Sequence, residues 1–185
     1  MLRAIVLTAA ALAFATPASA YSNPISRGLA DFLNIFSEQP VLRQVVPWNG
    51  KQAPGTVVVS TSQRRLYYVL GRGQAIRYGV GVGRQGFSWS GTKTVSRKRE
   101  WPDWRPPAAM LKRRPDLPRY MAGGMENPLG ARAIYLGSSL YRIHGSNEPD
   151  TIGAAVSSGC IRMTNRDVMD LYDRVRPGTK VIVQR

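Results

Sequence analysis

The chain contains one histidine, His144, and one cysteine, Cys160, sixteen positions apart. A thiol attacks a carbonyl carbon as the thiolate, and an ordinary thiol pKa of about 8.5 leaves little thiolate at neutral pH. A catalytic cysteine therefore needs a neighbouring base or a positive field. His144 is the single imidazole that could act as this base, so the pair predicts a nucleophilic cysteine site. A buried structural cysteine is the alternative that the residue type leaves open.

Glycines stand next to both residues, Gly145 after His144 and Gly159 before Cys160. A residue without a Cβ atom lets the backbone pass close to a substrate. Backbone N–H groups around Gly159 and Cys160 could therefore form an oxyanion hole for a tetrahedral intermediate. Both glycines could equally be ordinary turn residues.

Short apolar segments after Gly55 predict the strands that position this pair. Alternating apolar residues on either side of a Gly-Arg-Gly turn indicate a β-hairpin, and turn residues bound the other segments. The predicted strands cover residues 57–59, 64–70, 74–82, 131–136, 140–143 and 179–183. His144 then falls at a strand end, and the domain is predicted to be mostly β.

Two further segments complete the predicted domain. After Cys160, apolar residues at helical spacing from Val168 to Val175 predict a helix capped by Thr164 or Asn165. Residues 83–130 are rich in Gly, Pro and Trp, and we expect an irregular functional loop or lid there. The whole chain is therefore predicted to hold one or two short helices beside its strands.

The first twenty residues combine a basic start, an apolar run and a small-residue site that ends at Ala20. This pattern is typical of a cleaved secretory signal peptide. The apolar run is too short to span a membrane, and no later segment is long and apolar enough. We expect a periplasmic protein cut after Ala20, with no transmembrane segment in the mature chain. An extension over residues 21–54, with a short helix at 30–36, would precede the domain at 55–185.

The chain is strongly basic, with 26 Lys and Arg against 11 Asp and Glu and a formal charge of +15. Such a charge favours anionic partners, although a merely solvated basic surface is the alternative. No zinc-finger spacing, RNP-like stretch or basic heptad region supports a nucleic-acid partner. Carboxylate-rich wall polymers and anionic lipids suit the expected compartment better. One His and one Cys do not make up a usual metal ligand set, so neither a metal nor a cofactor is predicted.

Two motifs in a fixed order carry a family resemblance. They are His-Gly-Ser-Asn-Glu-Pro at 144–149 and Ser-Ser-Gly-Cys-Ile-Arg-Met at 157–163, followed by Asn165, Asp167 and Leu171. Together they resemble the signature of the bacterial L,D-transpeptidase catalytic domain, and the likeness extends over about residues 55–183. The resemblance implies a β-sandwich-like domain that catalyses acyl transfer on peptidoglycan stem peptides, and it implies roles in peptidoglycan biosynthesis, cell wall organisation and cell shape.

The resemblance also implies roles for individual residues. Cys160 would attack the carbonyl between diaminopimelate and D-alanine, releasing D-alanine and leaving a thioester. His144 would accept the thiol proton and protonate the leaving amine, with the Gly145 carbonyl orienting its ring. Ser158 stands where many members carry a second histidine, which puts one auxiliary contact in doubt. Arg162 would brace the site or bind a substrate carboxylate through its planar fork.

Four further side chains are weaker candidates for binding substrate. The segment from Trp101 to Tyr120 resembles the loop that covers the cleft in relatives, so Trp101 and Trp104 could hold a glycan-linked peptide. A local aromatic cluster is the alternative for each tryptophan. Tyr135 and Asn147 are candidates of the same kind.

Several alternatives remain at this point. A sortase would carry a Thr-Leu-x-Thr-Cys strand that this chain lacks, and papain-like amidopeptidases place Cys before His. A non-catalytic basic wall-binding module remains open. For an active enzyme, the acceptor could be a second stem peptide in a 3-3 cross-link, an outer-membrane protein, a free D-amino acid, or water, which would make an L,D-carboxypeptidase.

Overall fold

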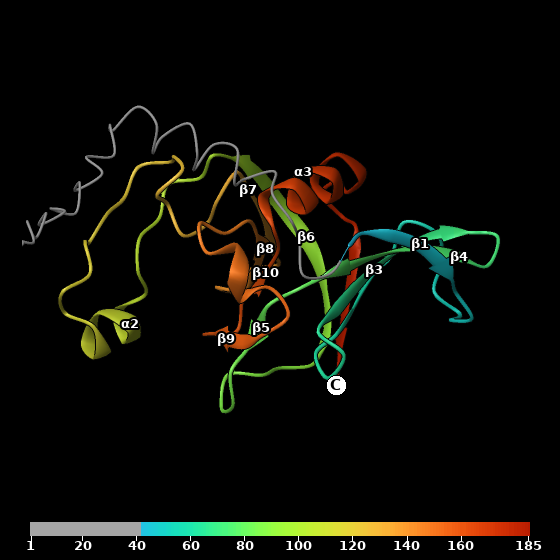
Figure 1. The fold of residues 1–185 in the computed structure, drawn as a ribbon, viewed down its shortest axis with the longest axis horizontal. Coiled ribbons are helices and arrows are strands. Elements are labelled where there is room, and N and C mark those ends of the chain that lie inside the picture. The colour runs from blue at the N-terminus through green and yellow to red at the C-terminus, as the bar shows by residue number, and fades with distance from the viewer. Residues whose placement is uncertain (1–41) are drawn as a thin grey trace, which may run out of the picture.

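The computed structural model describes residues 42–185, and Figure 1 shows how their elements are arranged. The predicted signal peptide at 1–20 and the short helix at 30–36 lie outside the described residues, as does most of the predicted extension at 21–54. The part of that extension that is described includes strand β1 (Gln44–Pro47), which pairs antiparallel with β4 (Gln74–Gly79) at the edge of the main sheet.

The main sheet has nine strands in the order β1-β4-β3-β2-β11-β6-β7-β8-β10. Its remaining strands are β2 (Val57–Ser60), β3 (Arg65–Gly71), β6 (Gly91–Glu100), β7 (Arg132–Leu136), β8 (Arg142–His144), β10 (Ile161–Arg162) and β11 (Lys180–Gln184). A separate parallel pair joins β5 (Val82–Gly83) to β9 (Ala155–Ser157). These strands confirm the prediction of a mostly β domain.

Strand β6 joins the two halves of the sheet. Its first residues pair with β11, its later ones pair with β7, and the register shifts between Val95 and Arg97. Such an irregularity lets one strand turn from one sheet layer into the next. Buried apolar side chains from both halves then share one core, which includes Val57 and Leu66 on one side and Ile134 and Ile143 on the other.

The expectation that residues 83–130 are irregular throughout was wrong for β6. This strand is ten residues long, and Val95 is its single buried residue. Apolar alternation is the sequence signal for a half-buried strand, and an exposed strand that carries Lys93, Arg97, Lys98 and Arg99 does not produce it. The pairing of β6 with two neighbours therefore became visible in the tertiary structure alone.

Helix α3 (Asn165–Arg174) packs against β7 and β8, which are the strands that lead to the predicted site. Thr164 is its N-cap and accepts a hydrogen bond from the Asp167 backbone N–H, so Thr164 rather than Asn165 caps the helix. A second helix, α2 (Ala108–Arg113), lies in residues 101–130, an excursion of the chain away from the sheet (Figure 1). None of the helices in residues 42–185 is long and apolar enough to cross a membrane.

Candidate active site

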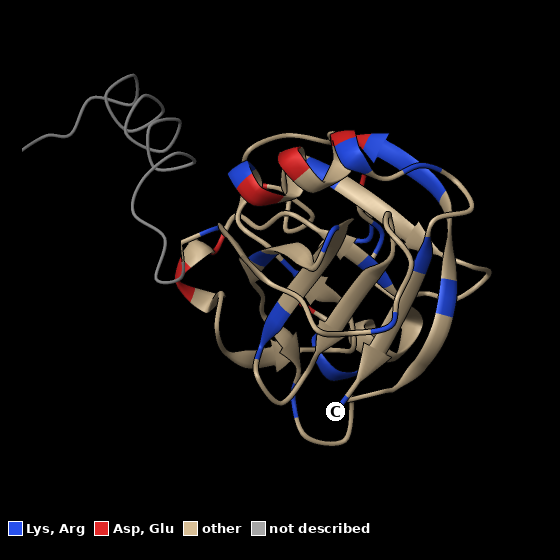
Figure 2. Cartoon of the chain, turned by 90° about the vertical axis from the view of Figure 1, so that its right-hand side faces the viewer, with Lys and Arg blue, Asp and Glu red and all other residues tan. Residues whose placement is uncertain are grey.

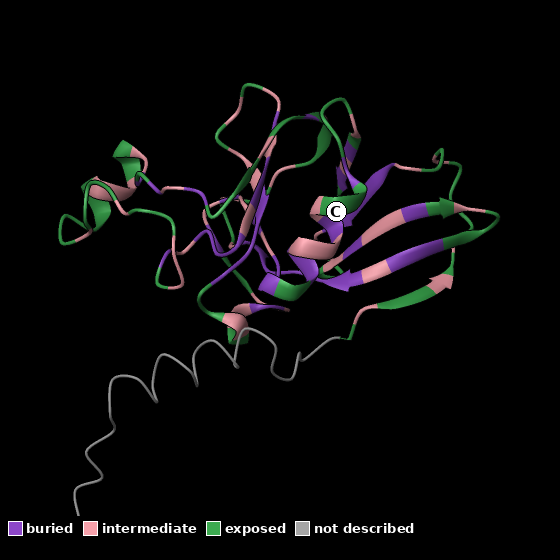
Figure 3. Ribbon diagram, turned by 90° about the horizontal axis from the view of Figure 1, so that it is seen from above, coloured by how far each residue is buried: buried purple, intermediate pink, exposed green. Residues whose placement is uncertain are grey.

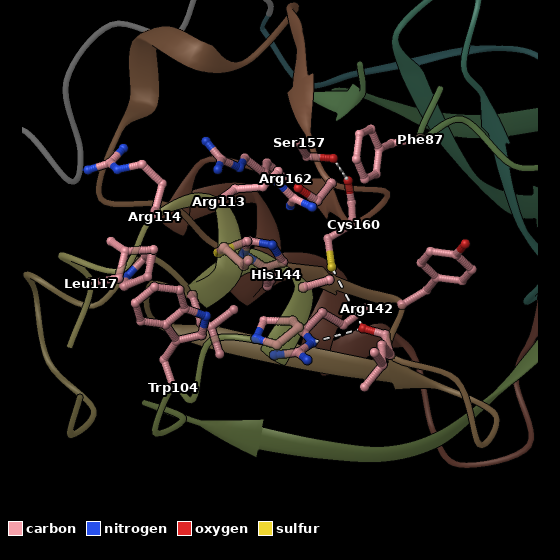
Figure 4. A pocket seen from close by; sticks show the side chains of 18 of the residues that line it. Phe87, Trp104, Arg113, Arg114, Leu117, Arg142, His144, Ser157, Cys160 and Arg162 are labelled. Carbon is pink, nitrogen blue, oxygen red and sulfur yellow. Dashed lines mark hydrogen bonds between the residues drawn. The ribbon is translucent and has the colours of Figure 1, made fainter. Parts of the chain in front are cut away.

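His144 ends one of two neighbouring parallel strands, β8, and Cys160 directly precedes the other, β10. Strand β10 begins directly after Cys160 and pairs with β8, with Ile161 opposite Ile143 and Arg162 opposite His144. The Met163 N–H also donates to the His144 carbonyl at 2.8 Å. Both predicted catalytic side chains line the same cavity (Figure 4), so the structure brings the two residues to one site.

The His144 ring is buried and held in one tautomer. Its Nδ1 atom lies 2.6 Å from the Gly145 carbonyl oxygen, and because a carbonyl only accepts, Nδ1 must carry the proton. The other ring nitrogen, Nε2, is then left with a lone pair that can accept a proton. Burial lowers the pKa of His144 to about 3, and Arg162 and Arg142 act in the same direction. The imidazole is therefore neutral at neutral pH.

The Cys160 thiol is also neutral in this resting arrangement. Burial raises its pKa above the ordinary value, and the charges of Arg142 and Arg162 offset part of that rise. Its Sγ atom lies 3.8 Å from the Leu140 carbonyl oxygen, within reach of a weak hydrogen bond. A neutral thiol beside a neutral imidazole means that proton transfer accompanies attack on a substrate, rather than preceding it.

The turn from Ser157 to Cys160 is held by its own hydrogen bonds. The Ser157 hydroxyl donates to the Cys160 carbonyl at 2.6 Å and accepts from the Gly159 N–H at 3.1 Å. Gly159 has φ +104°, and a Cβ atom there would lie 2.6 Å from the Tyr141 ring, so only glycine fits. The Trp89 indole, stacked on Tyr141, donates to the Gly159 carbonyl at 2.8 Å.

These bonds change the predicted oxyanion hole. The Gly159 N–H is engaged with Ser157, whereas the Cys160 N–H has no hydrogen-bond partner among residues 42–185. The Cys160 N–H is therefore the donor that remains available from the predicted pair. Sequence reasoning overlooked Ser157 and Trp89, since a serine at the end of a three-residue strand and a tryptophan in a loop give no pattern of their own.

Asn165 holds the loop after His144 in place. Its Oδ1 accepts from the Ala131 N–H at 2.8 Å, and its Nδ2 donates to the Ser146 carbonyl at 3.1 Å. The side chain is buried, and a Cβ atom on Gly145 or Gly130 would collide with its Oδ1 atom. Asn165 thus ties α3 to the backbone that positions His144. The sequence indicated this residue as a possible helix cap and as part of the family signature, without this tethering role.

The cavity measures about 620 Å³ and lies between two walls. One wall carries Cys160, His144, Ser158, Arg142 and Arg162 from the strands and their turns. The other belongs to the excursion that includes α2, and it contributes Trp104, Pro107, Met110, Arg113, Arg114 and Leu117. Figure 4 shows Trp104, Leu117 and Arg114 across the cavity from Cys160.

The cavity is basic. Arg162 forms an ion pair with Glu148 at 2.9 Å, and Arg114 forms one with Asp116 at 2.6 Å. Arg113 and Arg142 have no carboxylate partner in the part of the chain that the structure describes. The site is therefore suited electrostatically to an anionic substrate.

A single buried amide organises the excursion over the cavity. Asn127 is 1% exposed, and its Nδ2 donates to the carbonyls of Pro102 and Ala122 at 3.1 and 2.9 Å. Its Oδ1 accepts from the Leu129 N–H at 2.9 Å. The amide therefore joins the two ends of the excursion.

The other predicted substrate-binding residues divide into two groups. Trp104 is buried and lines the cavity, as do Ser158 and Arg162. Trp101 is 42% exposed, and Asn147 is exposed and donates to the Glu126 carbonyl; neither lines the cavity. Tyr135 lies beneath the Arg97 guanidinium, also outside the cavity.

Within residues 42–185, no group of three or more His, Cys, Asp or Glu side chains is placed to hold a metal ion.

Comparison with known proteins agrees on one family. Residues 54–183 match the model of the L,D-transpeptidase catalytic domain. A probable L,D-transpeptidase, ErfK/SrfK of Escherichia coli strain K12, is 34% identical over 89% of this chain and 58% of its own length. The chain spans about half the length of the curated relatives it matches.

Solved structures show the same fold. An L,D-transpeptidase from Mycobacterium smegmatis superposes with a TM-score of 0.57 at 19% identity, covering 70% of this chain and 58% of that one. A Brucella melitensis protein named as a probable carnitine operon oxidoreductase is 44% identical with a TM-score of 0.54. That match covers 82% of this chain and 98% of the Brucella chain. The oxidoreductase name belongs to the Brucella protein and is not carried over to this chain.

Proposed function

Because this chain belongs to the family of L,D-transpeptidase catalytic domains, we propose that it is a cysteine transpeptidase acting on peptidoglycan stem peptides. One observation carries the proposal. Cys160 shares a basic cavity with an imidazole whose Nδ1–H is fixed on the Gly145 carbonyl, which leaves Nε2 as the base.

In the acylation step, Cys160 Sγ attacks the carbonyl carbon between diaminopimelate and D-alanine while its proton passes to His144 Nε2. The carbonyl oxygen becomes an oxyanion, and the Cys160 N–H donates a hydrogen bond to it. The C–N bond then breaks, His144 returns the proton to the leaving amine of D-alanine, and a thioester remains on Cys160.

The lowered pKa of His144 fits the second half of this step. A protonated imidazole whose pKa is about 3 is a strong acid, so it readily gives its proton to the departing amine. The same low pKa makes His144 a weak base. Removal of the thiol proton is therefore coupled to formation of the new carbon–sulfur bond, which withdraws charge from sulfur.

In the transfer step, an amine attacks the thioester carbon, His144 takes the amine proton, and the C–S bond breaks. The Cys160 thiolate then recovers a proton from His144. Water in place of the amine would give an L,D-carboxypeptidase. A lysine or amino terminus of an outer-membrane protein would give protein attachment, and a second stem peptide would give a 3-3 cross-link.

The two walls of the cavity have different roles in this proposal. Arg162, fixed by Glu148, braces the turn that carries Cys160 and adds positive charge for a substrate carboxylate. Trp104 and the apolar side chains of the excursion contact the peptide from the other side. Trp101, Asn147 and Tyr135 are not assigned to the donor peptide, because they lie outside the cavity.

The cellular setting is part of the proposal. A signal peptide over residues 1–20, cut after Ala20, would deliver the domain to the periplasm, where stem peptides are located. Residues 21–54 would then join the domain through β1. Sequencing the amino terminus of protein purified from the periplasmic fraction would test this, and an intact leader in the cytoplasmic fraction would contradict it.

Intact-protein mass spectrometry tests the chemistry. The native chain and a Cys160→Ala variant are incubated with a disaccharide-tetrapeptide that ends in diaminopimelyl-D-alanine. We expect an adduct lacking D-alanine, or D-alanine release, in the native protein alone. Absence of adduct, D-alanine and product from a folded protein would contradict the proposal. Co-sedimentation with purified sacculi would then test the wall-binding module.

A further inference from the structure

Three side chains form a row across the sheet beside the site. Arg97 on β6 stands opposite Tyr135 on β7, and Tyr135 stands opposite Arg142 on β8. The guanidinium carbons of Arg97 and Arg142 lie 4.1 and 5.5 Å from the centre of the Tyr135 ring. Strand side chains alternate between faces, so Arg142 shares its face with His144, two residues further along β8.

The row reaches the nucleophile through Arg142. The Arg142 Nε donates to the Leu140 carbonyl at 3.4 Å, and Cys160 Sγ faces the same oxygen (Figure 4). Extending the pairing of β10 with β8 by one residue places Cys160 beside Arg142. Arg142 lines the cavity, whereas Arg97 and Tyr135 lie outside it. The row therefore runs from Arg97 on β6 to Arg142, which lines the cavity together with Cys160.

The positive charge of this row is not neutralised within residues 42–185. Neither Arg97 nor Arg142 takes part in an ion pair there. Figure 2 shows further basic residues along β6. A guanidinium stacked on an aromatic ring keeps its N–H edge free to bind a carboxylate through two parallel hydrogen bonds.

We infer that Arg97, Tyr135 and Arg142 bind the carboxylate of the acyl acceptor, an inference that rests on the proposed transpeptidase function. An α-amino acid centre carries its amine and its carboxylate on one carbon. A carboxylate held at Arg142 therefore brings the amine close to the thioester on Cys160. A protein lysine and water have no such carboxylate, so the site selects amino-acid-type amines over both.

Acceptor competition on the acyl-enzyme tests this selection. Acyl-enzyme formed by the native protein is offered D-methionine or D-methioninamide, and the ratio of amine transfer to hydrolysis is measured for each. We expect Arg97→Gln to lower transfer to D-methionine by about tenfold, the loss of one charge-assisted hydrogen bond, and to leave transfer to the carboxamide unchanged. The Arg97→Lys variant should transfer to D-methionine at a level between those of the native protein and Arg97→Gln, because lysine keeps the positive charge but lacks the planar guanidinium.

The control is Arg176→Gln, an equal change of charge at an exposed residue whose side chain makes no hydrogen bond or ion pair in the described part of the chain. It should behave as the native protein does. Equal losses with both amines in Arg97→Gln, or no preference for D-methionine in the native protein, would overturn the inference while leaving acylation through Cys160 intact.

A binding measurement separates this inference from the chemistry. The Cys160→Ala protein, which cannot be acylated, is titrated with D-methionine and with its carboxamide while the arginine Nε–H signals are followed by NMR. Shifts of the Arg97 and Arg142 signals with D-methionine alone support the site. No shift, or equal shifts with both, would overturn it even if no acyl-enzyme ever formed.

Discussion

The cavity has two walls that are built in different ways. One wall, here called the floor, comprises β8, β10 and the turn at 157–160. The other wall, here called the lid, is the excursion of residues 101–130. On the floor, His144 is 4% exposed and Ile143 and Ile161 are buried, within a ladder of paired strands. The lid holds one short helix with no buried residue, and Figure 3 shows it as mostly half-buried or exposed backbone.

Under the proposed function, this difference would separate chemistry from substrate recognition. Proton transfer requires donor and acceptor atoms to be held in fixed positions, which close packing and paired backbone provide. Contact with a peptide tolerates adjustment, so the lid needs only to be tethered, and Asn127 provides that tether. Changes on the floor should therefore lower the rate of chemistry, and changes on the lid should weaken substrate binding.

The largest effect is expected from His144→Gln on the floor. Loss of the base should lower the acylation rate by roughly 10² to 10⁴-fold. Acylation by the variant should then rise steeply with pH up to the raised pKa of the thiol, because hydroxide must remove the proton. Stopped-flow or quenched mass spectrometry of acylation measures both, and a variant rate that is flat with pH would contradict the assigned role.

The native enzyme should differ from that variant in acid. Since the pKa of His144 is lowered to about 3, the imidazole stays neutral as the pH falls from 8 to 5, and acylation should not decline through its protonation. The unfolded chain takes up this proton near its ordinary pKa of about 6.5, so His144 lowers the free energy of unfolding as the pH falls from there. An activity loss centred near pH 6.5 would contradict a buried neutral ring.

Asn165→Ala should have the next largest effect, again on the floor. It leaves the buried Ala131 N–H and Ser146 carbonyl without partners, which should cost about 2 to 4 kcal/mol of unfolding free energy. We expect kcat to fall with little change in KM, because the loop after His144 loosens. Denaturant unfolding and steady-state kinetics check both. Asn165→Asp retains an oxygen that can accept from the Ala131 N–H, so it should lose less unfolding free energy than Asn165→Ala.

Asn127→Ala tests the lid by the same kind of change. The substitution releases the carbonyls of Pro102, a buried residue, and of Ala122, an exposed one, so we expect a loss of about 1 to 2 kcal/mol of unfolding free energy, with a raised KM and a largely retained kcat. Limited proteolysis should cut within residues 101–130 faster than in the native protein. A fall in kcat matching that of Asn165→Ala would remove the distinction between the two walls.

The smallest effects distinguish two residues of the lid itself. Trp104→Ala removes a buried ring from the cavity wall and should raise KM by about tenfold. Trp101→Ala removes an exposed ring outside the cavity and should change KM by less than about twofold. Steady-state kinetics of the two variants provide the comparison, and equal effects would show that the lid closes further over the substrate.

Much of the fold followed from local pattern. The hairpin of β3 and β4, the strands that end at His144 and the helix after Cys160 were all predicted, because each buries a regular apolar set. Strand β6 was missed because just one of its residues is buried. Of the predicted substrate-binding side chains, Trp104 and Arg162 reach the cavity, whereas Trp101, Asn147 and Tyr135 do not.

The sequence by itself determined which groups could do the chemistry, since a chain with one imidazole and one thiol offers a single such pair. The tertiary structure decided the protonation state of those groups and the hydrogen bonds around them. Burial keeps the His144 ring neutral, the Gly145 carbonyl fixes its proton on Nδ1, and the Gly159 N–H donates to the Ser157 hydroxyl. Asn165, Asn127 and the Arg97–Tyr135–Arg142 row depend on contacts between residues far apart in the chain, and one-dimensional spacing carries no record of such contacts.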